Sequence, residues 1–373
     1  MASIDLLSFA SVVITDGLAA LREPTHRDTG RRANCSLFER MRSHVRPALL
    51  SLFMIVGAAA CRDAPAHQRA PLVQTLEVST VGNGMLTLPN SATSVKFAVI
   101  GDSGRGNLPQ HEIAAQMVRF HERFPYAFVL MVGDNIYEGP ATSEDYRKKF
   151  EEPYQRLLDE GVKFYAVLGN HDDPREVGYP LFNMDGERYY SFSPPEDLLA
   201  KIVTRVEFFA LDSTNLDRTQ LRWLDERLGK SKATWKVCFF HHPLYTSGRY
   251  RTQSRLHRLI LEPLLVTHDV DVAFSGHEHI YQRIELQRGI QYFISGGAGS
   301  LRPGDGAPSR YVAQSFDRDY HFMLIEIDGD ELHFQAISRP GQTIDAGTLF
   351  KDGHDARPLE YSGARHRDTV VLH

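Results

Sequence analysis

Carboxylate, amide, phenol and imidazole side chains recur in five short motifs along this chain of 373 residues. The motifs are Gly101–Gly104 (GDSG), Gly133–Tyr137 (GDNIY), Gly169–Asp172 (GNHD), His241–Pro243 (HHP) and Gly276–His279 (GHEH). Their side chains offer the oxygen and nitrogen donors that hard and borderline metal ions bind. A single Gly-Asp pair means little, because such dipeptides are common in turns. Five motifs of this type in one chain predict a centre that holds two metal ions.

Each motif comes after an apolar run that is typical of a buried strand, and four of the five follow their run directly. The runs are Val95–Ile100, Phe128–Val132, Val162–Leu168, Val237–Phe240 and Val270–Phe274. In α/β folds, ligands bind at the carboxyl ends of parallel strands. We therefore expect one edge of one sheet to gather the polar side chains of all five motifs.

The segments between these strands have a helical pattern. Ile113, Met117 and Phe120 follow the i, i+4, i+7 spacing of an amphipathic helix, and Pro153 marks a boundary or kink in the next helical segment. Further strands are expected at Arg188–Phe192, Val206–Leu211, Ile290–Ile294, His321–Ile327 and Glu331–Ile337. The sequence therefore predicts an α/β fold in which two mixed β-sheets pack face to face with helices outside, within a single catalytic domain.

The amino-terminal region is predicted to carry an export signal. Residues 41–61 start with a basic stretch, continue through an apolar run and end at Cys61, which is the order of a secretory signal peptide. Ala58–Cys61 resembles the signal of bacterial lipoproteins, in which the Cys becomes lipidated; the alternative is an ordinary signal peptide cut near Ala60. We expect an exported protein of the bacterial periplasm or cell surface, with membrane attachment only through a lipidated Cys61.

The rest of the chain divides as follows. Because Met41 would be a natural start, residues 1–40 are interpreted as an over-extended and unstructured start. Residues 62–94 are expected to form a tether with an entry strand near Thr75–Val81, residues 95–350 the catalytic domain, and residues 351–373 a polar tail. A monomer is assumed.

Composition excludes several classes of protein. The net charge of -5 argues against a nucleic-acid partner held by bulk charge. The basic residues at positions 249, 251, 255 and 258 are interpreted as a solvated helix face. Three cysteines are too few for a disulfide framework, and Cys238 lies in an apolar strand as a small core residue.

In type and order, the five motifs resemble those of the calcineurin-like metallophosphoesterases, over about residues 95–300. Within this family, a Tyr three residues after the second Asp, here Tyr137 after Asp134, resembles the purple acid phosphatase branch, and residues 133–137 are most similar to its small tartrate-resistant type. Gly104 stands where most other branches have His. The resemblance implies an acid phosphatase that acts on small phosphomonoesters through direct attack by metal-held hydroxide.

The resemblance also implies which residues hold the ions. Asp102, Asp134, Tyr137 and His279 would hold one ion, and Asp134, Asn170, His241 and His277 the other. Phenolate and carboxylate suit Fe(III), whereas the second set suits a divalent ion such as Fe, Zn or Mn.

Two residues beside these ligands are implied to be catalytic. His171 would stabilise the transition state or protonate the leaving group. Asp172 would orient His171 or a ligand.

Substrate contacts are less defined. Relatives carry additional His residues shortly after the His-Pro motif, where this chain has Tyr250 and Arg251. The candidate substrate-binding residues are Asn170, His171, His242, Arg249, Tyr250 and Arg251. Arg can bind phosphate through paired hydrogen bonds but cannot act as a general acid, so substrate preference stays open.

Other functions remain as alternatives. A phosphodiesterase acting on cyclic nucleotides or other diesters could use the same metal centre. A surface binding protein without turnover is a third possibility, which the complete set of ligands argues against. Gly296–Gly299 could suggest a nucleotide-phosphate loop, but no dinucleotide fingerprint surrounds it, and a tight turn beside the metal site is favoured.

Overall fold

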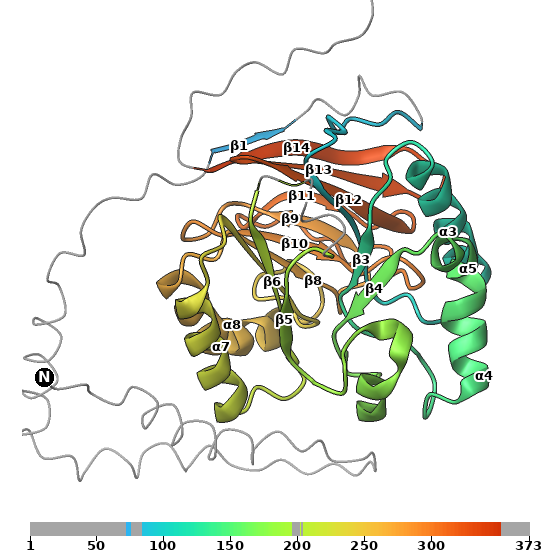
Figure 1. The fold of residues 1–373 in the computed structure, drawn as a ribbon, viewed down its shortest axis with the longest axis horizontal. Helices are drawn as coiled ribbons and strands as arrows, with labels where there is room; N and C mark the ends of the chain where they lie inside the picture. Colours follow the sequence, from blue (N-terminus) through green and yellow to red (C-terminus); the bar gives the residue numbers. More distant parts are fainter. Residues whose placement is uncertain (1–71, 76–83, 196–201, 203, 352–373) are drawn as a thin grey trace, which may run out of the picture. The chain divides into compact units, whose positions relative to one another are not determined.

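The computed structural model describes residues 72–75, 84–195, 202 and 204–351. Within them lie two seven-stranded sheets (Figure 1). The first sheet contains, in spatial order, β1 (Leu72–Thr75), β14 (Thr343–Phe350), β13 (Glu331–Ser338), β12 (His321–Asp328), β2 (Val95–Ile100), β3 (Phe128–Met131) and β4 (Lys163–Ala166). The second contains β11 (Val312–Phe316), β9 (Tyr281–Ile284), β10 (Gln291–Ser295), β8 (Val272–Ser275), β7 (Trp235–Phe239), β6 (Val206–Ala210) and β5 (Tyr190–Phe192).

Each sheet has a parallel part that carries the motifs. In the first sheet β2, β3 and β4 are parallel, and in the second β6, β7, β8 and β10 are parallel. Three motifs follow β2, β3 and β4, and the other two follow β7 and β8. The expectation of a single sheet edge is therefore wrong, because the motifs divide between two sheets.

Alternating side chains of the strands build three layers of core. Phe97 and Val99 of β2 pack in the layer between the two sheets, together with Phe208 of β6. Ala98 and Ile100 face the opposite way, into a layer shared with α3 and α5. A third layer packs the second sheet against α7 and α8. Figure 1 shows α3 and α5 on one side of the molecule and α7 and α8 on the other. The predicted fold class is confirmed.

The helices begin and end for identifiable reasons. They are α3 (Leu108–His121), α4 (Ser143–Tyr146), α5 (Glu152–Asp159), α7 (Arg218–Lys230) and α8 (Arg251–Thr267), with short η4 (Pro174–Gly178) and η5 (Pro180–Phe182). The predicted stripe of α3 is buried, and Asn107 caps this helix by accepting from the backbone of Gln110. Pro153 is the second residue of α5 and follows the wide turn η3 (Arg147–Glu151), so a boundary lies where the sequence predicts one.

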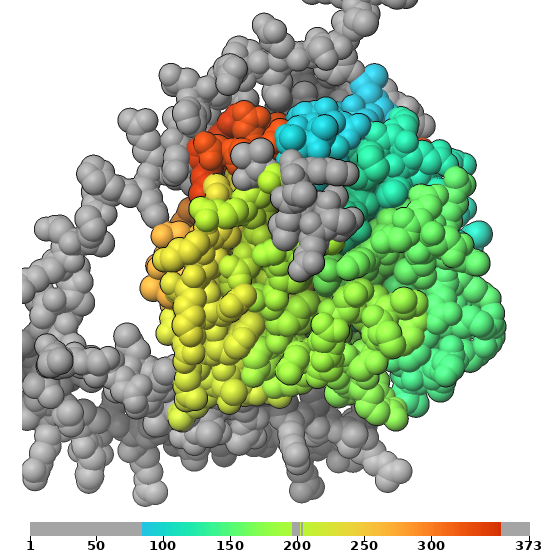
Figure 2. Space-filling view, in the orientation of Figure 1, coloured from blue at the N-terminus to red at the C-terminus, as the bar shows by residue number. Residues whose placement is uncertain are grey.

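Residues 84–94 lie beside the carboxyl-terminal strands of the first sheet. Thr87 donates its backbone N–H to Gln335, and Asn90 donates to Glu326. Figure 2 shows these segments, in blue and red, side by side on one face. This part of the predicted tether is therefore bound to the catalytic fold.

Several predictions fall on residues outside the described ranges. They are the over-extended start, the signal peptide with Cys61, most of the tether, and the polar tail. A strand, β1, lies at Leu72–Thr75 and shares only Thr75 with the entry strand predicted at Thr75–Val81; residues 76–83 lie outside the described part. None of the helices among the described residues combines the length and the apolar character that crossing a bilayer requires.

Candidate metal centre

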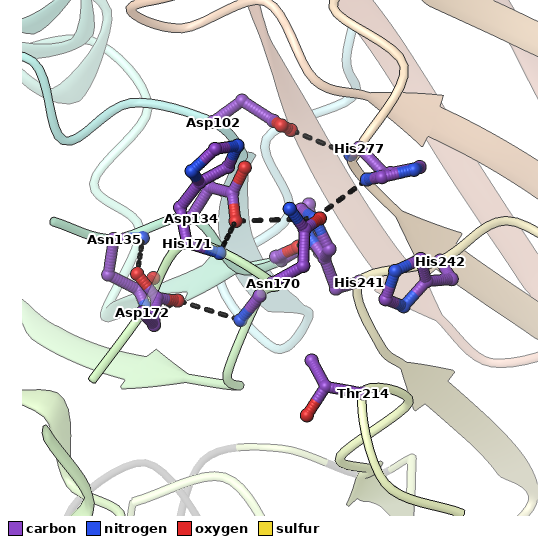
Figure 3. A network of polar contacts seen from close by, with 12 residues as sticks. Asp102, Asp134, Asn135, Asn170, His171, Asp172, Thr214, His241, His242 and His277 are labelled. Atoms are coloured by element: carbon purple, nitrogen blue, oxygen red, sulfur yellow. Dashed lines mark hydrogen bonds and ion pairs between the residues drawn. The ribbon is translucent and has the colours of Figure 1, made fainter. Parts of the chain in front are cut away.

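Turns from both sheets bring the motif side chains together in one place (Figure 3), where Asn170 and His171 are exposed and the other predicted ligands are buried. In the first donor group, the Tyr137 hydroxyl lies 2.8 Å from Asp134 Oδ2, 3.1 Å from His279 Nε2 and 3.3 Å from Asp102 Oδ1. His279 Nε2 and Asp102 Oδ1 are 3.3 Å apart. Ligand atoms from two sheets thus converge: the Tyr137 hydroxyl lies within 3.3 Å of the other three, and those of Asp102, Asp134 and His279 lie within 4.8 Å of one another.

The second donor group surrounds His241. Its Nε2 lies 3.1 Å from Asn170 Oδ1, 3.2 Å from His277 Nδ1 and 3.3 Å from Asp134 Oδ1. Asp134 therefore directs one carboxylate oxygen into each group. Asp134 thus lies between the two donor groups, and the resemblance implies that it is the shared ligand.

The hydrogen bonds at the back of the imidazoles suit a cation. His241 Nδ1 lies 2.9 Å from the Val132 carbonyl oxygen, and His277 Nε2 lies 3.2 Å from Gln253 Oε1. Because both partner atoms are oxygens that accept, His241 carries its proton on Nδ1 and His277 carries its proton on Nε2. His241 Nε2 and His277 Nδ1 then each have a free lone pair, and these two nitrogens face each other. Such partners fix the tautomer of metal-binding histidines. The chemistry of the donor set therefore fits a metal ion.

Burial sets the protonation of the ligands. It lowers the pKa of His277 to about 2, with help from His241, and that of His279 to about 3, with help from Arg302. Neutral imidazole is the form that binds metal. Burial also raises the pKa of Tyr137 far above its usual value, and Asp102 and Asp134 raise it further. The phenol therefore keeps its proton until a cation displaces it.

The backbone of the ligand turns is strained. Asp102 and Asp134 have φ of 54° and His277 has φ of 67°, in the left-handed region that side chains rarely adopt. Each such residue costs about 1–3 kcal/mol, and strain of this kind clusters at functional sites. A Cβ on Gly169 would collide with the Asp134 carboxylate, and one on Gly276 with Asp102 Oδ2. The motifs contain Gly at these two positions because the ligands approach the backbone closely.

Residues 95–281 match the model of the family described as calcineurin-like phosphoesterase. The chain belongs to this family. Purple acid phosphatase 7 of Arabidopsis thaliana is 28% identical over 289 residues, covering 66% of this chain and 87% of that protein. Tartrate-resistant acid phosphatase type 5 of Rattus norvegicus is 24% identical over 308 residues, covering 72% and 92%. The predicted relationship to the purple acid phosphatases is confirmed, and the chain is a metal-dependent phosphoesterase.

Two solved structures show the same fold. One is GAP50, the anchor in the inner membrane complex of Plasmodium, with a TM-score of 0.62 and 19% identity, covering 70% of this chain and 90% of that one. The other is the purple acid phosphatase PPD1 of yellow lupin, with a TM-score of 0.55 and 17% identity, covering 74% and 58%. At these identities the likeness extends to the fold alone.

The two residues expected to be catalytic in this phosphoesterase occupy different positions. The ring of His171 is exposed, its centroid lies 4.9 Å from that of Tyr137, and its backbone N–H donates to Asp134 Oδ1. The carboxylate of Asp172 instead accepts from the backbone of Asn135, Ile136 and Gly169 and from the Asn135 amide. Asp172 therefore holds the turns that carry the ligands; none of these four donors belongs to the His171 ring or to a ligand side chain.

The candidate substrate-binding residues divide in the same way. Asn170 is a member of the second donor group, and His242 is buried with its ring 4.5 Å from that of His277. The Tyr250 ring lies 4.2 Å from the same imidazole. Arg249, 60% exposed, faces Asp305 at 3.6 Å, and Arg251 is the exposed first residue of α8. His242 and Tyr250 are thus placed beside the centre.

Some residues at the site have no signal in the sequence. Gln253 supports His277 from the first turn of α8, and Arg105 and Arg302 adjoin the ligand turns. None belongs to a motif whose chemistry marks it. Glu278 points away from the ligands, as its alternation with His277 and His279 predicts. It accepts from the backbone of Arg249 and Tyr250.

Proposed function

We propose that this phosphoesterase is an acid phosphatase that hydrolyses phosphomonoesters with two bound ions, Fe(III) and a divalent ion of Fe, Zn or Mn. The observation that carries the proposal is the division of Asp134, whose two oxygens each complete one donor group. The relatives support it, because they are named purple and tartrate-resistant acid phosphatases. The phenol of Tyr137 favours Fe(III) in the first group.

The residues then have distinct tasks. Asp102, Asp134, Tyr137 and His279 would hold the trivalent ion, and Asp134, Asn170, His241 and His277 the divalent one. When bound, such a pair lowers the pKa of water and neutralises charge on the phosphoryl oxygens. His171 would donate a proton to the departing alkoxide; its exposure and the 4.9 Å between its ring and that of Tyr137 support this role. Asp172 fixes the loops that carry Asp134 and Asn170.

The test combines metal analysis with an ester panel. We expect purified protein to contain iron and a divalent ion, and to hydrolyse 4-nitrophenyl phosphate faster than bis(4-nitrophenyl) phosphate at acid pH. Asp134→Ala should lose turnover together with both metals. Asp225→Ala, which removes an exposed carboxylate of α7, is the matched control. Retained metal in Asp134→Ala would refute its shared role, and preference for the diester would make the protein a phosphodiesterase.

We also propose that the protein is exported and anchored through a lipid on Cys61. Support comes from the order of basic, apolar and small residues within 41–61. Mass spectrometry of the native protein should find a lipidated Cys61 as the first residue. An unmodified terminus near residue 61 would indicate ordinary signal cleavage, and peptides from residues 1–40 would show that translation starts before Met41.

A further inference from the structure

Two arginines adjoin the ligand turns. Arg302 follows the glycine-rich segment after β10; its backbone N–H donates to the His279 carbonyl at 3.1 Å, and its Nη1 lies 3.4 Å from the His277 carbonyl oxygen. Arg105 follows the turn after β2, and its guanidinium lies 3.6 Å from the centroid of the Tyr137 ring. Arg302 therefore adjoins the turn that supplies a ligand to each donor group, and Arg105 adjoins the first group.

Neither guanidinium group pairs with a buried carboxylate of the described residues: Arg302 donates to the His277 carbonyl oxygen, and Arg105 Nε donates to Ser300 Oγ at 2.9 Å. Arg302 is partly buried, yet no carboxylate pairs with it in the part of the chain that the structure describes. The acidic neighbour of Arg105 is Glu138, at 3.5 Å and with a side chain that is 78% exposed, which makes a weak pair. By contrast, buried Arg283 is bound by Asp345 at 2.7 Å. Arg302 and Arg105 are therefore available to an anion.

The charges of the centre point to the same conclusion. Its donors carry at most three negative charges, on Asp102, Asp134 and Tyr137, whereas two metal ions carry at least four positive ones. An arginine stays charged at any pH of interest. Two more cations beside this excess are unfavourable until an anion binds.

Tyr250 holds Arg302 in this position. Its ring lies 4.2 Å from the His277 ring and 5.2 Å from the Arg302 guanidinium. A guanidinium near an aromatic face is attracted to it and loses freedom of movement. Contact with the Tyr250 ring therefore limits the movement of the Arg302 guanidinium.

We propose that Arg302, assisted by Arg105, binds the free phosphoryl oxygens of the substrate and selects dianionic phosphomonoesters over diesters. The inference rests on the proposed function of the same centre. A guanidinium binds phosphate through two parallel hydrogen bonds, which need two free oxygens on one side of the phosphorus. In a diester a second ester group takes the place of one free oxygen and one negative charge, so the arginines gain less from it.

The experiment uses the metal-loaded protein with Arg302→Gln and Arg302→Lys. Arg227→Gln on α7 is the matched control, since it removes one charge from a side chain 49% exposed and paired with Glu207. Binding of orthophosphate is measured by isothermal titration calorimetry, together with metal content and with kcat/KM for 4-nitrophenyl phosphate and its bis ester. Arg302→Gln should weaken orthophosphate binding and monoester kcat/KM by roughly 10–100-fold, the usual loss of a charged hydrogen bond. The diester value should fall less, and Arg302→Lys should lie between.

Each outcome has a distinct meaning. Orthophosphate binding and monoester turnover in Arg302→Gln equal to those of Arg227→Gln would overturn the inference. Equal losses for the two esters would overturn the selectivity, and loss of metal in both Arg302 variants would make Arg302 a structural residue. If the wild type hydrolyses no monoester, the proposed function fails, whereas orthophosphate binding still reports on Arg302.

Discussion

Replacing Asp172 by Asn perturbs the metal centre without changing a ligand. The two oxygens of Asp172 accept four hydrogen bonds at 2.6–3.0 Å, three of them from backbone N–H groups of the turns after β3 and β4. Asn has the same shape but presents an NH2 group where one oxygen accepts two of these bonds. Two donors then face a third donor in a buried place.

The magnitude follows from this count. A buried donor left without an acceptor costs about 1–3 kcal/mol, so two of them cost about 2–6 kcal/mol. Movement of the two turns relieves part of this cost, and the turns carry Asp134 and Asn170. Loss of such a supporting group typically weakens metal binding about 10–100-fold. We therefore expect Asp172→Asn to weaken binding of the divalent ion about 10–100-fold. We expect the free energy of unfolding to fall by the part of the cost that movement of the turns does not relieve.

Competition with a chromophoric chelator measures the metal affinity, and chemical unfolding followed by circular dichroism measures the stability. Asp173→Asn is the control, because the neighbouring Asp173 caps η4 and pairs with Arg175 away from the ligands. A metal dissociation constant in Asp172→Asn equal to that of the wild type would refute the reasoning, since it would show that the turns hold their ligands without this carboxylate.

Three further predictions concern single residues. Tyr137→Phe should abolish the visible charge-transfer band of iron-loaded protein, and a band that survives would refute the assignment of Fe(III) to this phenolate. Burial lowers the pKa of His321 to about 3, so near pH 6.5 the unfolded chain binds a proton that the folded chain does not bind. The free energy of unfolding therefore falls as the pH drops below 6.5, by about 2 kcal/mol down to pH 5. In unfolding titrations, His321→Leu should show a loss that is smaller by this amount. Asp345→Ala leaves the buried charge of Arg283 unpaired and should cost about 3–5 kcal/mol, whereas joint replacement of both by apolar residues should restore most of it.

The strands before the motifs could be predicted because burial on both faces leaves a continuous apolar run in the sequence. The run at Val95–Ile100 is β2 with the same bounds, and the other four shift by up to two residues. β14 was not predicted, because its sequence contains Thr, Asp and Gly. Its burial depends in part on contacts distant in sequence, namely pairing with β1 and the ion pair of Asp345 with Arg283.

The ligands could be predicted and their supports could not. A ligand needs a particular side chain after a particular strand, so Asp134 and His277 stand out in the sequence. Gln253 and Arg302 reach the centre from a helix and a loop whose local sequence serves other purposes. The division of the motifs between two sheets was also hidden, because a parallel strand has the same sequence pattern in either sheet.

That division links metal binding to folding. The first donor group takes Asp102, Asp134 and Tyr137 from the first sheet and His279 from the second, and the second group also draws on both sheets. Neither group is complete until the layer between the sheets has packed. Ions that bind only the packed state stabilise it by mass action. A substitution in that layer, such as one that removes the ion pair between Arg283 and Asp345, should therefore weaken metal binding although every metal ligand is unchanged.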